Sequence, residues 1–114
     1  MAPDIISLSR PNFIEATRNA YSDDLTDEQV KKYFSLLEEY VTEHNDVYTD
    51  TDRPVSERQW VCAKRAVQLI IRGSMLDALH AMYEMLDDLG NRGNIAYHEY
   101  KLFSVVFEVY NNKR

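Results

Sequence analysis

The same helix-start signal occurs twice in this chain, and it constrains the fold more than any other feature. Thr26 is followed three residues later by Gln29, and Ser56 is followed in the same way by Gln59. In this arrangement, a capping box, the hydroxyl and the amide side chain satisfy backbone N–H groups that the first helical turn leaves open. An apolar residue precedes each cap and another follows at the fourth helical position, as in a hydrophobic staple. Two α-helices are therefore predicted to begin directly after these caps.

Apolar residues continue both helix starts at intervals of three, four and seven, the spacing of one helical face. The first of these helices is expected to end near Asn45, because the segment from Asp46 to Pro54 is rich in Asp and Thr and has the composition of a loop. Gly73-Ser74 interrupts the second pattern, so that helix is expected to kink or break there. A further helix is then predicted over about Met75–Leu89.

Two more helices complete the predicted fold. The last one is expected to run from an Asn94 cap to about Asn111, with a strand over Ser104–Tyr110 as the alternative because this segment is rich in β-branched and aromatic residues. A short first helix is predicted over about Arg10–Tyr21, after an extended or mobile segment at residues 1–8. The sequence therefore predicts an all-α fold, a compact bundle of four to five helices in which residues 1–114 form a single domain.

Each helix of such a bundle is expected to bury one apolar face. The residues predicted to form the core are Phe34, Leu37, Val41, Trp60, Val67, Ile70, Leu79, Met82, Leu86, Leu102, Val105 and Val109. The last helix is apolar almost all round, so an aromatic seam on it is expected to stay on the surface and to bind a second copy of the chain, as a homodimer, or another protein. That seam consists of Tyr100, Phe103, Phe107 and Tyr110.

Composition restricts the class of protein. The chain has 114 residues with only three Gly and three Pro, too few for the many turns of an all-β sandwich. No apolar run approaches the ~20 residues that span a bilayer, and the N-terminus lacks the pattern of a secretory signal. The single cysteine, Cys62, is expected to be a buried, inert thiol and fits a reducing compartment. We therefore expect a cytoplasmic protein with no membrane partner.

The charges are unevenly distributed, and their distribution carries the functional prediction. Residues 33–52 contain no Lys or Arg and six acidic side chains, Glu38, Glu39, Glu43, Asp46, Asp50 and Asp52. The three glutamates fall in the last turns of a predicted helix. There the helix dipole presents its negative end, and an exposed carboxylate destabilises the helix by roughly 0.3–1 kcal/mol. Acids placed against helix stability indicate that something outside the fold requires negative charge.

Three interpretations of this acidic run are open: a solvated face without a partner, a docking surface for a basic protein, and a site for a cation or another small ligand. Docking includes DNA mimicry, because Glu39 and Glu43 lie one helical turn apart, about 6 Å along the axis, close to the ~7 Å between phosphates on one strand. The loop acids lack the spacing of an EF-hand. We favour docking, and we predict a small, non-catalytic interaction protein that blocks or recruits a basic protein, such as a nucleic-acid-binding one.

A basic stripe on the helix that follows Ser56 has two interpretations. Arg58, Arg65 and Arg72 recur every seven residues, with Lys64 beside them, over about 20 Å at 1.5 Å per residue. The stripe could follow a phosphate backbone, but the net charge of −6 opposes direct binding of nucleic acid. We expect instead that the stripe lies beside the acidic helix and pairs with its carboxylates.

One group of residues has the chemistry of a metal site. Asp77, His80 and Glu84 are spaced so that they share one face of the helix predicted over Met75–Leu89. Sites with two carboxylates and one histidine occur in helical bundles, but they draw ligands from several helices, and no second Glu-x-x-His pair accompanies this one. The alternative to our prediction is therefore a small metal-binding protein or enzyme that uses these residues. Our own prediction includes no catalytic residue, metal or other cofactor.

Overall fold

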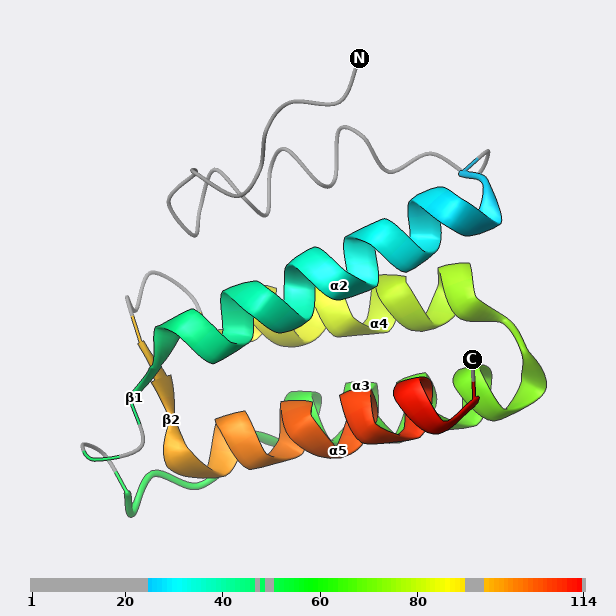
Figure 1. Cartoon of the computed structure of the whole chain (residues 1–114). Helices are drawn as coiled ribbons and strands as arrows, with labels where there is room; N and C mark the ends of the chain where they lie inside the picture. Colours follow the sequence, from blue (N-terminus) through cyan, green and yellow to red (C-terminus); the bar gives the residue numbers. More distant parts are fainter. Residues whose placement is uncertain (1–24, 47, 49–50, 90–93, 114) are drawn as a thin grey trace.

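The computed structural model describes residues 25–46, 48, 51–89 and 94–113 (Figure 1). Four helices make up most of this part of the chain, α2 (Asp27–His44), α3 (Glu57–Arg72), α4 (Met75–Asp88) and α5 (Tyr97–Lys113). Two short strands, β1 (Asn45–Asp46) and β2 (Ile95–Ala96), pair in parallel at one end of the bundle. The predicted helical bundle is confirmed. The helix expected over Arg10–Tyr21 and the segment 1–8 lie outside the described residues.

Both predicted capping boxes are present. The hydroxyl oxygen of Thr26 accepts a hydrogen bond from the backbone N–H of Gln29 at 3.2 Å, and the Thr26 N–H donates to Oε1 of Gln29 at 2.8 Å. Ser56 and Gln59 form the same pair of bonds at 3.1 and 3.4 Å. The helices α2 and α3 therefore begin where the local chemistry of the sequence places them, and α2 ends at its Asn45 cap as expected.

The helix that begins after Ser56 breaks at Gly73. This glycine has a φ of 84°, in the left-handed region, and its N–H donates to the carbonyl of Ile70 at 3.0 Å. The N–H of Ser74 donates to the carbonyl of Leu69 at 2.8 Å. These two bonds form a Schellman motif, which satisfies carbonyls that the last turn leaves open. As a result α4 turns back and packs along α3 (Figure 1).

The face that α3 turns toward the core differs from the predicted one. Its buried residues are Gln59, Cys62, Ala63, Ala66 and Ile70. Because α3 packs against both α4 and α5 through a face with small side chains, Cys62, Ala63 and Ala66, the larger Trp60 lies outside this buried face. Trp60 is accordingly 50% exposed, so its assignment to the core was wrong, and Val67 is only half-buried.

The face that α5 turns toward the core is also different from the prediction. Phe103, Phe107 and Tyr110 are buried, Tyr100 is half-buried, and the prediction of an exposed aromatic seam was therefore wrong. The Tyr110 ring stacks on Phe34 of α2, with ring centroids 4.0 Å apart. The valine expected on the buried side, Val105, is 52% exposed instead.

The remaining residues of the predicted core are largely confirmed. Val109 is half-buried. The buried ones are Phe34, Leu37, Val41, Ile70, Leu79, Met82, Leu86 and Leu102. These side chains come from all four described helices and form one continuous cluster, as expected for a single small bundle.

The start of α5 is held by a buried carboxylate and not by the predicted Asn94 cap. Glu99 is only 4% exposed, and its Oε1 accepts a hydrogen bond from the backbone N–H of Ala96 at 3.0 Å. Its Oε2 accepts from the side-chain amide of Gln59 at 3.3 Å, which joins α5 to α3. Asn94 instead donates to a carboxylate oxygen of Asp46 at 3.4 Å, beside the β1–β2 pair.

Candidate functional site

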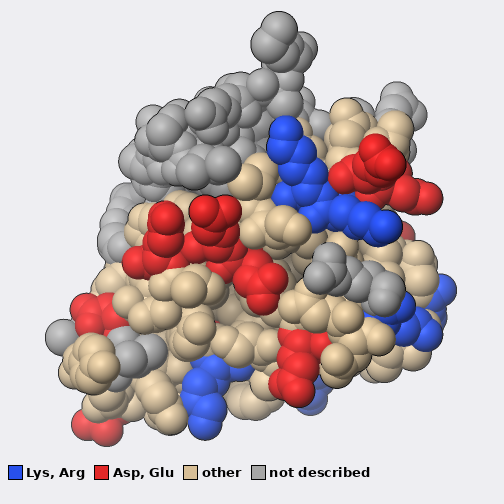
Figure 2. Space-filling model, in the orientation of Figure 1, with Lys and Arg blue, Asp and Glu red and all other residues tan. Residues whose placement is uncertain are grey.

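The glutamates of the acidic run lie on the C-terminal half of α2. Glu39 and Glu43 are exposed, whereas Glu38 is half-buried toward α5. Figure 2 shows acidic side chains gathered over this half of the helix, with basic side chains nearer its beginning. The negative end of the helix dipole therefore coincides with a group of carboxylates, and the positions of the charges agree with the sequence-based prediction.

The basic stripe of α3 does not neutralise these glutamates. Arg58 lies 3.7 Å from Asp87 and 3.8 Å from Asp88, so it pairs with the end of α4. Arg65 lies 3.6 Å from Glu84, which is also on α4. The prediction that the stripe pairs with the acidic helix was therefore wrong. In the part of the chain that the structure describes, Glu39 and Glu43 form no ion pair.

A polar hollow of about 280 Å³ lies between α2 and α5, next to these glutamates. The carboxylates that line it are those of Glu38 on α2 and Glu108 on α5, and no Lys or Arg is among its described lining residues. Asn111 donates a hydrogen bond to Oε2 of Glu38 at 3.4 Å, across the gap between the two helices. Two carboxylates beside one hollow can accept hydrogen bonds from an ammonium or guanidinium group.

The structure adds one residue to the predicted site and sets others apart. Sequence analysis missed Glu108, whose position beside α2 depends on how two distant helices pack. Asp46 is half-buried in β1 and bonded to Asn94, Asp52 is exposed in the following turn, and Asp50 lies outside the described residues. We therefore define the acidic surface by four residues, Glu38, Glu39, Glu43 and Glu108.

The residues of the alternative metal site have other environments. Glu84 lies 3.6 Å from Arg65 and accepts a hydrogen bond from the Cys62 thiol at 3.3 Å. Burial lowers the pKa of His80 to about 4, so its ring is neutral near pH 7, and Asp77 is exposed. No group of three or more His, Cys, Asp and Glu side chains within the described residues is arranged to hold a metal ion. The geometry therefore does not favour this alternative.

The only cysteine lies in the core, as predicted. Burial raises the pKa of the Cys62 thiol, and its hydrogen bond to the Glu84 carboxylate raises this pKa further. Since a thiolate is the reactive form of cysteine, both effects keep the group protonated and unreactive near neutral pH.

Comparison of the chain with protein-family models, with curated proteins and with solved structures finds no match. Across the described ranges, no helix combines the length and the apolar content needed to cross a bilayer. The functional proposal therefore depends on the arrangement of the side chains.

Proposed function

We propose that this chain is a small, non-catalytic interaction protein that binds a basic region of another protein through the acidic surface. The observation that carries this proposal is the partition of charge within the bundle. Arg58 and Arg65 form their ion pairs with acidic residues of α4. In the described part of the chain, Glu39 and Glu43 form no ion pair.

Physical chemistry supports a partner with Lys or Arg at this position. The exposed glutamates repel one another and oppose the dipole of α2, and a bound cation would relieve both effects. A Lys or Arg side chain that entered the hollow could contact Glu38 and Glu108 together. Such charge complementarity accelerates encounter and selects among partners more than it increases affinity.

The more specific form of the proposal is DNA mimicry, in which the partner is a nucleic-acid-binding protein. The acidic surface would then occupy the partner's binding groove, with carboxylates in the places of phosphates. The axial separation of Glu39 and Glu43, about 6 Å at 1.5 Å per residue, supports this form. The ion pairs of Arg58 and Arg65 argue against the alternative in which the basic stripe itself binds nucleic acid.

Comparative affinity capture from a native lysate tests the proposal. The variant Glu39→Gln/Glu43→Gln removes two charges from the acidic surface. The control Glu57→Gln/Asp77→Asn removes the same charge from exposed positions on α3 and α4. We expect the wild type and the control to capture the same basic protein, and the acidic-surface variant to lose it. When the captured protein has been purified, Glu39→Gln/Glu43→Gln should bind it with a lower association rate than the wild type does. This rate should also depend less on salt concentration.

Two results would contradict the proposal. One is capture of the same proteins by both variants at equal yield. The other is a clearly lower melting temperature for Glu39→Gln/Glu43→Gln, because the two acids would then stabilise the fold instead of serving a partner. Relief of the conflict with the helix dipole predicts an equal or slightly higher melting temperature.

A further inference from the structure

An apolar groove runs between α3 and α5, on a different side of α5 from the acidic surface. Two adjoining hollows of about 430 and 250 Å³ share Trp60, Leu102 and Val105, so they form one groove. Ser104 and Glu108 of the same helix line the polar hollow beside α2. The helix α5 therefore separates two surfaces of different chemistry.

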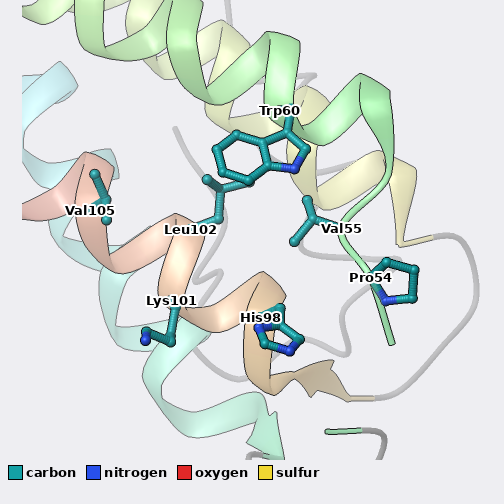
Figure 3. Close-up of a pocket in the computed structure, with 7 residues that line it drawn as sticks. All are labelled: Pro54, Val55, Trp60, His98, Lys101, Leu102 and Val105. Atoms are coloured by element: carbon teal, nitrogen blue, oxygen red, sulfur yellow. The ribbon is translucent and has the colours of Figure 1, made fainter. Parts of the chain in front are cut away.

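This groove is lined by large apolar side chains, of which Trp60 and Val105 are about half exposed and Leu102 is buried. Figure 3 shows the Trp60 indole projecting from α3 toward Leu102 of α5, with Val55 and Pro54 at one end. The apolar stripe continues along α3 through Val67 to Ile71, which is 58% exposed. From Trp60 to Ile71 the helix rises about 16 Å. Exposed apolar residues gathered in this way are typical of a binding surface.

The charged residues that line the groove are all cationic. Lys64 on α3 and Lys101 on α5 are its described charged lining residues, and no Asp or Glu lines either hollow in the described ranges. Both lysines are exposed, and neither forms an ion pair with a described residue. The ammonium group of Lys101 also lies 5.3 Å from the centroid of the Tyr97 ring, a cation–π contact within α5.

We propose that this groove binds an acidic amphipathic helix of a partner protein. Apolar side chains at intervals of three, four and seven on that helix would cover Trp60, Leu102 and Val105. Its carboxylates would face Lys64 and Lys101. The length of the stripe, about 16 Å, corresponds to about three turns of a bound helix. A helix that binds in a groove contacts it through residues spaced i, i+3, i+4 and i+7. With the acidic surface on the other side of α5, the chain would then hold two partners of opposite charge.

Two other occupants fit the groove less well. A second copy of the chain, related by two-fold symmetry, would place one cationic rim against another, and like charges across an interface oppose association. A single-stranded nucleic acid would find the two lysines and the rings of Trp60 and His98. Most of the other described lining side chains are aliphatic and offer no further ring on which successive bases could stack.

Trp60 is the only tryptophan in the chain, so its fluorescence reports on the groove directly. The probe is a synthetic helical peptide of about four turns, without Trp or Tyr, that carries leucines along one face and glutamates beside them. We expect this peptide to cause a saturable blue shift of the Trp60 emission. A matched peptide with lysine in place of glutamate should bind at least about tenfold more weakly.

Charge reversal at the rim makes the test specific. The variant Lys64→Glu/Lys101→Glu should reverse the preference between the two peptides, and Lys64→Gln/Lys101→Gln should remove it. The control Lys31→Glu/Lys32→Glu changes two exposed lysines of α2 by the same charge and should keep the wild-type preference. Thermal melts of all variants establish that they are folded before binding is compared.

Three outcomes would overturn the inference. The first is no saturable shift up to about 1 mM peptide, or equal affinity for the two peptides. The second is a saturable response to oligothymidylate that exceeds the response to the acidic peptide, which would assign the groove to nucleic acid. The third is a dimer in sedimentation that dissociates in Val105→Glu, which would assign the groove to a second copy.

Discussion

Two neighbouring valines test the orientation of α5, on which both proposed surfaces depend. Val106 is fully buried, whereas Val105 is 52% exposed. Replacing a buried valine by alanine removes two methyl groups, each worth about 0.8 kcal/mol, and leaves a small cavity. Alanine is also the better helix former, by up to ~0.7 kcal/mol, and this gain offsets part of the loss at both positions. We therefore expect Val106→Ala to lower the free energy of unfolding by ~1–2 kcal/mol and Val105→Ala by ~0–0.5 kcal/mol.

Urea unfolding followed by circular dichroism measures both values under the same conditions. In a thermal melt, the difference between the variants should amount to about 4 °C or more for each kcal/mol. Equal losses, or a larger loss for Val105→Ala, would refute the orientation. Such a result would place Val105 in the core, as the hydrophobic periodicity of the sequence predicts, and would remove both the groove and the polar hollow beside Glu108.

Three further predictions concern the core and the α3–α4 turn. The half-buried His80 has a pKa of about 4 in place of 6.5, so between these values the folded state binds fewer protons than the unfolded state. Stability should therefore fall as the pH falls from about 6.5 to 4. In His80→Gln, the melting temperature should depend less on pH over this range. The same pH dependence in the variant and the wild type would contradict this prediction. Gly73→Ala should lower the free energy of unfolding by ~1–2 kcal/mol, because Gly73 has a φ of 84° that alanine adopts only with strain. Gly73→Asn should lower it less, since asparagine tolerates this conformation better. Equal losses for the two variants would exclude a conformational cause. The Cys62 thiol should react with a thiol reagent much more slowly in native protein than in urea, and equal rates would contradict its burial.

The starts of α2 and α3 and the break at Gly73 could be predicted because the chemistry that sets them is local, whereas the Asn94 cap predicted for α5 was wrong. Each capping box uses residues only three positions apart, and the left-handed Gly73 ends α3 with bonds to carbonyls of the preceding turn. The buried faces were harder to predict. The capping box and staple place Trp60 at the fourth position of α3 but do not determine its burial, which depends on how α3 packs against α4 and α5.

The orientation of α5 could not be predicted for a related reason. This helix is apolar around most of its circumference, so its periodicity does not distinguish one buried face from another. The face is set by long-range packing, including the stacking of Tyr110 on Phe34.

The acidic surface could be predicted only in part, for the same reason. The run of acids is visible in the sequence, but the pairing of Arg58 with α4 and the position of Glu108 beside α2 depend on which helices are neighbours.

Zero-length cross-linking tests the proposed function most directly. A carbodiimide joins a carboxylate to a lysine amine only when the two are in contact, and mass spectrometry of the products identifies both residues. In a native lysate we predict that Glu39, Glu43 and Glu108 cross-link to lysines of a basic protein, and that high salt abolishes these products. Cross-links that form mainly at the exposed acids of α3 and α4, such as Glu57 and Asp77, would contradict the assignment of the acidic surface as the binding site.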